Sequence, residues 1–286
     1  MSDLELPKGI TSVVENGLNA YRIDTPQCSG LVYEHGAHVA SWKPAGQDEV
    51  LWMSDNSVFS PDKAIRGGVP ICFPWFGPGR SGDRTPAHGF ARLSEWYLVG
   101  ASVEKGVAIL SLELTGDEVD DLGGFPSDFT ARLDVSMGNE LTLALTVAAG
   151  ETPLVFEEAL HTYFRVSDIH DVKVLGLDGV TFVDKVAGGA ATQEGPVIFS
   201  GRTDRVYPSA AATQIVDPVR KVTIDKVNSG DSVVWNPWDE IAASMADFAS
   251  DAWPQMVCVE AANCLGNEVT VQPGEAHTMS FTASIS

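Results

Sequence analysis

Apolar and polar residues alternate with a period of two along several short segments of this chain. Successive side chains of a β-strand point to opposite faces, so this pattern is typical of strands that bury one face. Turn-forming residues bound the segments, as at Glu104-Lys105-Gly106 and Met137-Gly138-Asn139. The strands that this pattern predicts are at residues 18–24, 107–114, 141–147, 221–227 and 278–285.

Helix signals are sparse beside these strands. The best helix candidate is residues 241–249, which Pro237 and Pro254 limit. Short strands between turns, recurring along the whole chain, indicate an antiparallel β-sandwich or barrel. No repeat, linker or low-complexity tract divides the 286 residues, of which 44% are apolar. We therefore predict an all-β fold with few short helices, built as a single domain over residues 1–286.

The chain carries a formal net charge of −21, from 39 acidic and 18 basic side chains. A field of this sign repels the phosphate backbone of nucleic acids and anionic membrane surfaces, so we expect neither as a partner. No apolar run approaches the roughly 20 residues that a membrane-spanning helix needs. The opening residues MSDLELPKG lack the basic and apolar regions of a signal peptide. We expect a cytoplasmic protein.

Four cysteines are scattered along the chain: Cys28, Cys72, Cys258 and Cys264. Because no two of them form a Cys-x-x-Cys pair, we expect neither a disulfide framework nor a zinc site, which fits a reducing compartment. The four are expected to be small, mostly buried apolar residues. His35 and His38 have an HxxH spacing without an evident partner carboxylate, so we take both as structural and predict no metal.

Residues 62–92 interrupt the strand pattern with a Gly- and Pro-rich, irregular excursion. Loops this long inside a compact domain are usually functional or disordered. Embedded aromatic residues such as Phe73, Trp75 and Phe90 need burial and argue against disorder. The segment also holds four of the ten arginines: Arg66, Arg80, Arg84 and Arg92. In an otherwise acidic protein, this is where an anionic ligand group would bind.

Several short motifs follow one another in a recognisable order. They are RGGVP (66–70) with HGFAR (88–92), EALHTYF (158–164) and VCVEAAN (257–263). In this order they resemble the aldose 1-epimerase superfamily, and within it the glucose-6-phosphate 1-epimerase (hexose-6-phosphate mutarotase) branch. Weaker echoes at residues 36–42, 203–207 and 234–238 extend the resemblance over most of the chain.

The resemblance implies a large antiparallel β-sandwich of the galactose mutarotase type, with the site in a cleft on one sheet. The histidine matching His161 then acts as general acid and the glutamate matching Glu260 as general base. The residues matching Arg66, Arg92 and Asp204 bind substrate, and arginines around the cleft receive a 6-phosphate.

One position departs from the family pattern. Many members have Gln directly before the HGFAR-like motif, where this chain has Ala87, and that Gln contacts the substrate in relatives. The identity of the sugar therefore stays open. His88 is predicted to bind substrate by hydrogen bonding a sugar hydroxyl, and anchoring the loop is the alternative role, which is nearly as well supported. We expect Trp235 and Trp238 to belong to the core rather than to stack on a sugar.

The chemistry of anomer exchange accounts for these residue types. A cyclic hemiacetal opens when a proton leaves the anomeric hydroxyl and another reaches the ring oxygen. Histidine has an unperturbed pKa of about 6.5, so it can donate a proton near neutral pH, and a glutamate can accept one. Arginine presents a planar fork that binds two phosphate oxygens at once, and a free hexose would not need such charge. No metal or organic cofactor is required.

We therefore predict a hexose-6-phosphate mutarotase that interconverts the α and β anomers of glucose 6-phosphate or a related sugar phosphate. Its only expected partner is that small molecule, and we expect a monomer. Two alternatives stay open: an aldose 1-epimerase acting on free sugars, and a carbohydrate-binding sandwich without catalysis.

Overall fold

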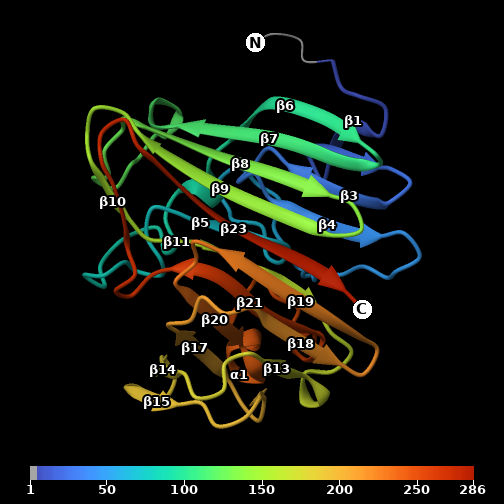
Figure 1. The fold of residues 1–286 in the computed structure, drawn as a ribbon, viewed down its shortest axis with the longest axis vertical. Coiled ribbons are helices and arrows are strands. Elements are labelled where there is room, and N and C mark those ends of the chain that lie inside the picture. Colours follow the sequence, from blue (N-terminus) through green and yellow to red (C-terminus); the bar gives the residue numbers. More distant parts are fainter. Residues whose placement is uncertain (1–4) are drawn as a thin grey trace.

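The computed structural model describes residues 5–286, and over this range the protein is built almost entirely from β-strands (Figure 1). The strands form sheets of nine, eight, four and two members, and neighbours in the two large sheets run antiparallel. One short α-helix and four 3-10 turns complete the described elements. The prediction of an all-β fold with few short helices is confirmed. No helix of residues 5–286 is long and apolar enough to cross a membrane.

The nine-stranded sheet contains β6 (Tyr97–Glu104), β7 (Val107–Thr115), β8 (Phe129–Met137), β9 (Leu141–Ala149), β13 (Lys173–Leu175), β16 (Val197–Ile198), β18 (Thr213–Asp217), β19 (Arg220–Val227) and β23 (Ala276–Ile285). Their order across the sheet is β16-β13-β18-β19-β23-β9-β8-β7-β6. This sheet runs from the top to the lower half of the molecule in Figure 1.

The eight-stranded sheet contains β5 (Ile71–Cys72), β11 (Glu158–Leu160), β12 (Tyr163–Arg165), β14 (Thr181–Asp184), β15 (Ala190–Thr192), β17 (Thr203–Tyr207), β20 (Asp231–Asn236) and β21 (Met256–Asn263). Its order is β15-β14-β17-β20-β21-β11-β5, and β12 pairs with β21 beside β11. The remaining strands are β1 (Ile10–Glu15), β2 (Leu18–Asp24), β3 (Cys28–Tyr33) and β4 (Val39–Pro44) in one sheet, and β10 (Leu154–Phe156) and β22 (Val269–Val271) in another.

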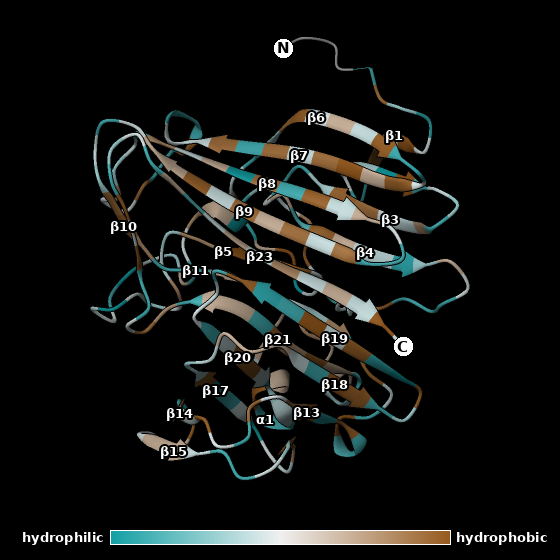
Figure 2. Ribbon diagram, in the orientation of Figure 1, coloured by the Kyte–Doolittle hydropathy of each residue, from teal (hydrophilic) through white to brown (hydrophobic). Residues whose placement is uncertain are grey.

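The strands predicted from alternation are all present, as β2, β7, β9, β19 and β23, with ends within two residues of those expected. Along β9 every second residue is buried, and Figure 2 shows the matching stripes of hydrophobic and hydrophilic residues on β7, β8 and β9. The buried face of these strands packs toward β1–β4, which lie behind them in Figure 1. Trp42 on β4 crosses this interface and donates its indole N–H to the carbonyl oxygen of Gly138 at 2.9 Å.

The helix differs from its prediction. Residues 241–249 were the candidate, but α1 spans Trp238–Ser244, and Met245 already has an extended backbone. The early end lets Asp247 pair with Arg66 at 3.0 Å and lets Phe248 stack on Trp52 at 4.8 Å between ring centroids. These tertiary contacts outweigh the helix propensity of the following residues. The 3-10 turns are η1 (Ala91–Leu93), η2 (Gly116–Glu118), η3 (Ile169–Asp171) and η4 (Trp253–Gln255).

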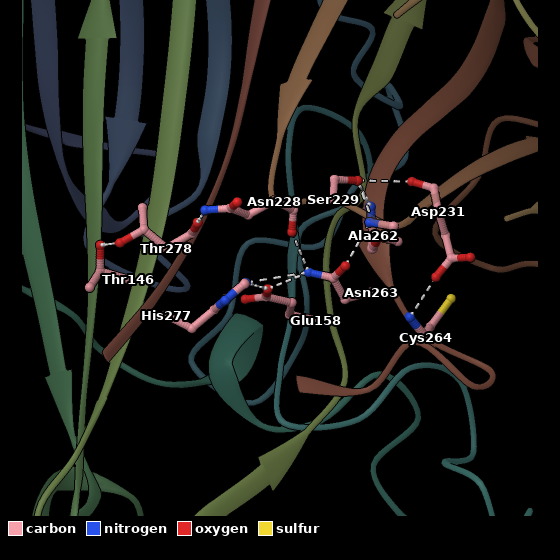
Figure 3. A network of polar contacts seen from close by, with 11 residues as sticks. Thr146, Glu158, Asn228, Ser229, Asp231, Ala262, Asn263, Cys264, His277 and Thr278 are labelled. Atoms are coloured by element: carbon pink, nitrogen blue, oxygen red, sulfur yellow. Dashed lines mark hydrogen bonds and ion pairs between the residues drawn. The ribbon is translucent and has the colours of Figure 1, made fainter. Parts of the chain in front are cut away.

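A polar network centred on the buried carboxylate of Glu158 joins the two large sheets (Figure 3). Glu158 on β11 is fully buried, and its Oε1 lies 3.0 Å from Nε2 of His277 on β23. The same carboxylate accepts a hydrogen bond of 2.8 Å from the amide of Asn263 on β21. That amide also donates to the carbonyl oxygen of Asn228, whose own amide donates to the carbonyl oxygen of Thr278. The network therefore fixes β11 and β21 against the nine-stranded sheet.

Replacing Glu158 with alanine is expected to lower the free energy of unfolding by about 2–4 kcal/mol, because the imidazole of His277 and the amide of Asn263 lose their buried acceptor. Urea denaturation followed by tryptophan fluorescence measures this loss. Glu275→Ala removes an exposed carboxylate beside β23 and is expected to change stability by no more than about 0.5 kcal/mol. If the two variants unfold alike, the network does not hold the sheets together.

Candidate active site

A pocket of about 270 Å³ opens over the eight-stranded sheet. It is lined by all six site residues predicted from the sequence: Arg66, His88, Arg92, His161, Asp204 and Glu260. Its volume lies just below the range of about 300–1,000 Å³ that is usual for small-molecule sites, which suits a compact ligand. Residues that are distant in the chain therefore meet in one cavity.

The sheet register explains how His161 and Glu260 meet. His161 directly follows β11, Glu260 lies on β21, and these strands pair antiparallel with Leu160 opposite Ala261. Nδ1 of His161 lies 3.4 Å from Oε1 of Glu260, and the two side chains are 10% and 1% exposed. The contact lacks the alignment of a hydrogen bond, so His161 Nδ1 and both Glu260 oxygens are buried without a hydrogen-bond partner among the described residues. Buried polar groups in this state are rare outside functional sites.

Burial sets the protonation of this pair. It raises the pKa of Glu260 well above its usual range, with the carboxylate of Asp204 adding to the effect and Lys185 and Arg92 opposing it. Burial and, to a smaller extent, the positive charges of Arg92 and Arg66 together lower the pKa of His161 to about 3. Both shifts favour the uncharged forms of the two side chains, a neutral imidazole beside a neutral carboxyl group.

Aromatic neighbours fix the orientation of the His161 ring. Tyr163, on β12, stacks on it with 4.9 Å between ring centroids and 12° between planes. Trp235 on β20 meets the same imidazole edge-on at 6.0 Å, and His88 does so at 5.6 Å. Held on three sides, the imidazole has little freedom to rotate away from Glu260. A fixed geometry of this kind is what proton transfer requires.

Positive charge gathers on the same pocket. Arg66 pairs with Asp247 and also donates to the hydroxyl of Tyr163 at 3.0 Å. Arg92 donates to the carbonyl oxygen of Ala87 at 2.7 Å, and its Nε is buried without a partner among residues 5–286. Lys185 is the third cation, 3.5 Å from the carboxylate of Asp204. Three cations in one small cavity make a receptor for an anionic group.

The irregular excursion of residues 62–92 shapes one side of the pocket, and its aromatic residues are buried as expected. Gly89 lies at φ +76°, and a Cβ there would stand 2.0 Å from the carbonyl oxygen of Phe73, so only glycine fits. The neighbouring His88 accepts a hydrogen bond from the backbone N–H of Gly77 at Nδ1 and also lines the pocket. It therefore anchors the loop, and Nε2 remains as the donor of the neutral ring.

Besides Phe76, Ala87 and Val233, three pocket residues were not predicted as site residues. Lys185 follows β14 in a stretch with no motif, and Tyr163 appeared only as part of the EALHTYF motif (158–164). Trp235 was expected in the core, and it packs against the cluster of Trp52 and Tyr163, but it also lines the pocket. Trp238 packs against Trp253 at 4.4 Å, as expected of a structural residue. Motif position alone could not distinguish the two tryptophans.

The other two arginines of the excursion lie elsewhere. Arg80 and Arg84 line a separate pocket of about 360 Å³, where Arg80 pairs with Glu268 and Arg84 covers the ring of Trp75 at 5.3 Å. This pocket is the larger of the two, but neither His161 nor Glu260 lines it. Proton-transfer chemistry therefore points to the smaller pocket.

Comparison with known proteins agrees with the assignment of this pocket as the active site. Residues 19–284 match the family described as aldose 1-epimerase. The chain belongs to the aldose 1-epimerase family. A Salmonella typhimurium relative named "Putative glucose-6-phosphate 1-epimerase" is 40% identical over 83% of this chain and 81% of its own length. An Escherichia coli relative of the same name is 37% identical over 89% of this chain and 86% of its own length.

Solved structures of this family share the fold. The crystal structure of a "putative mutarotase (YeaD)" from Salmonella typhimurium superimposes with a TM-score of 0.90 at 32% identity, covering 99% of this chain and 95% of that one. A galactose mutarotase-like protein from Clostridium acetobutylicum matches at a TM-score of 0.73 and 13% identity, over 97% of this chain and 98% of its own. The predicted galactose mutarotase-like sandwich is confirmed, and the protein is an isomerase-type enzyme of carbohydrate metabolism.

Proposed function

We propose that this member of the aldose 1-epimerase family is a hexose-6-phosphate mutarotase, which interconverts the α and β anomers of glucose 6-phosphate or a related sugar phosphate. The observation that carries the proposal is the contact of 3.4 Å between His161 and Glu260 inside a pocket that Arg66, Arg92 and Lys185 also line. The pair supplies proton exchange, and the cations supply a phosphate receptor. The names of the curated relatives agree with both parts.

Ring opening uses the pair as acid and base. Glu260, as carboxylate, accepts the proton of the anomeric hydroxyl, and His161, as imidazolium, donates a proton to the ring oxygen. The C1–O5 bond breaks with its electrons moving to O5, and C1 becomes an aldehyde. After rotation about C1–C2, the reverse transfers close the ring on the other face of C1. Each positioned transfer typically contributes about 100- to 10,000-fold to the rate.

Substrate binding favours the charged forms of His161 and Glu260 that ring opening needs. In the free protein burial favours the proton on Glu260, so it must move to His161 before ring opening, and this transfer requires the 3.4 Å contact to align as a hydrogen bond when the substrate binds. In the empty pocket the positive charges of Arg92 and Arg66 add to the effect of burial and lower the pKa of His161. A phosphate group bound to these cations offsets their charge and so raises the pKa of His161 again. Phosphate binding therefore favours the imidazolium that protonates the ring oxygen.

Anomer exchange of glucose 6-phosphate measured by NMR saturation transfer tests the proposal, with free glucose as the parallel substrate. We expect catalytic amounts of protein to raise the exchange rate of the phosphorylated sugar, and to act much less on glucose because the cations then have no anionic partner. Faster exchange of glucose than of any hexose 6-phosphate would make the protein an aldose 1-epimerase for free sugars. Binding of sugar phosphate without any acceleration would make it a binding protein and overturn the proposal.

A further inference from the structure

A third potential ligand atom lies beside the proton-exchange pair. Cys258 precedes Glu260 by two residues on β21, so both side chains leave the same face of the strand. His161 reaches that face from the end of β11. One donor atom from each residue, an imidazole nitrogen, a thiol sulfur and a carboxylate oxygen, lies within 4.8 Å of the other two.

The donors of this triad, His161, Cys258 and Glu260, are buried and have lone pairs to spare. His161 Nδ1 and both carboxylate oxygens of Glu260 are buried without a hydrogen-bond partner among the described residues. The Cys258 thiol is free and fully buried in a cluster with Tyr163 and Trp52, and it does not line the pocket. Unsatisfied polar atoms that converge from two strands are poised to receive a ligand that accepts electron pairs.

The chemistry of the donor set selects the kind of ion. A mixed set of nitrogen, sulfur and oxygen donors suits zinc, which is borderline soft and binds in tetrahedral geometry. Ligand bonds of about 2.0–2.3 Å place neighbouring donors roughly 3.3–3.8 Å apart. The His161–Glu260 separation of 3.4 Å already fits, and the other separations need to close by at most about 1.5 Å. Three protein ligands leave a fourth position open, as in zinc sites that accept a water or a substrate.

We propose that His161, Cys258 and Glu260 form a zinc-binding site, and that Zn²⁺ bound there blocks mutarotation. The ion enters through the pocket, which His161 and Glu260 line. It occupies the lone pairs that would otherwise carry the protons, so metal and substrate exclude each other. The inhibition depends on the proposed function, but the binding does not. This site departs from the expectation that the cysteines take no part in a metal site.

Cobalt(II) is the direct probe of binding, because it replaces zinc in tetrahedral sites and gives a thiolate-to-metal charge-transfer band when a cysteine coordinates it. One equivalent of Co²⁺ is expected to produce this band in the wild-type protein, and Zn²⁺ is expected to remove it. Cys258→Ser should lose the band. Cys264→Ser, which changes another buried cysteine outside the triad, should keep it. Absence of the band in the wild type, or its retention in Cys258→Ser, would overturn the proposal.

Inhibition is measured separately as the Zn²⁺ concentration that halves the mutarotation rate, relative to the metal-free rate of the same variant. Loss of one ligand is expected to raise this concentration at least about tenfold in Cys258→Ser, while Cys264→Ser matches the wild type. Near-ultraviolet circular dichroism verifies the folding of each variant, and Cys258→Ala provides a second test should the serine variant not fold. If the protein gives the cobalt band but accelerates no anomer exchange, the metal site is supported and the proposed mutarotase function is overturned. Active protein without the band would reject only the site.

Discussion

Replacing Glu260 with glutamine is expected to lower kcat for mutarotation of glucose 6-phosphate by about 100- to 10,000-fold. The amide has the shape of the carboxyl group but cannot accept the anomeric proton. Because Glu260 is buried and burial raises its pKa toward the neutral carboxyl form, the neutral amide should leave the fold intact. His161→Ala removes the other half of the exchange and should cost a similar factor.

Anomer exchange measured by NMR at saturating substrate provides the comparison, with the thermal unfolding midpoint as the test of integrity. Glu275→Gln, the same chemical change at an exposed carboxylate beside β23, is expected to keep the wild-type rate. A folded Glu260→Gln protein with more than about a tenth of the wild-type kcat would remove Glu260 from its role as base.

Replacing Arg92 with alanine is expected to lower kcat/KM for glucose 6-phosphate by about 10- to 150-fold, which corresponds to about 1.5–3 kcal/mol for a charge-assisted hydrogen bond. Arg92 is the informative choice because, within residues 5–286, its guanidinium has a carbonyl oxygen and no carboxylate as its hydrogen-bond partner, whereas Arg66 is held by Asp247. Free glucose has no phosphate for Arg92 to bind, so its kcat/KM should change little.

The discriminating quantity is the ratio of kcat/KM for the two sugars in each variant. Arg84→Ala provides the control, since Arg84 belongs to the same excursion but lines the separate pocket. It should leave both values unchanged. An equal loss for glucose and glucose 6-phosphate in Arg92→Ala would mean that Arg92 supports the pocket and does not bind phosphate.

The sequence predicted the strands well because their signal is local. Alternation of apolar and polar residues marks β2, β7, β9, β19 and β23 to within two residues at each end. Pairing across the sheets is not local: nothing in the sequence near Leu160 indicates that Ala261 lies opposite it. The helix ended early for the same reason, because Asp247 and Phe248 make contacts with partners almost 200 residues away.

The site was predicted through its motifs, and the residues outside those motifs were missed. His161 and Glu260 stand in recognisable segments, whereas Lys185 lies in a turn whose composition resembles that of many surface loops. Charge in the sequence could not show which arginines converge: Arg80 and Arg84 are close to Arg92 in the chain but line another pocket. The contact between Glu158 and His277 also joins distant strands, and no motif in the sequence predicted it.

The account requires that one pocket hold the phosphate and the anomeric centre of a single sugar. A crystal structure with 1,5-anhydroglucitol 6-phosphate tests this most directly, because that analogue lacks the anomeric hydroxyl and cannot open. We predict its ring oxygen beside His161 and Glu260, with the phosphate on Arg92 and its neighbouring cations. A phosphate bound instead by Arg80 and Arg84, with the ring away from His161, would contradict the account.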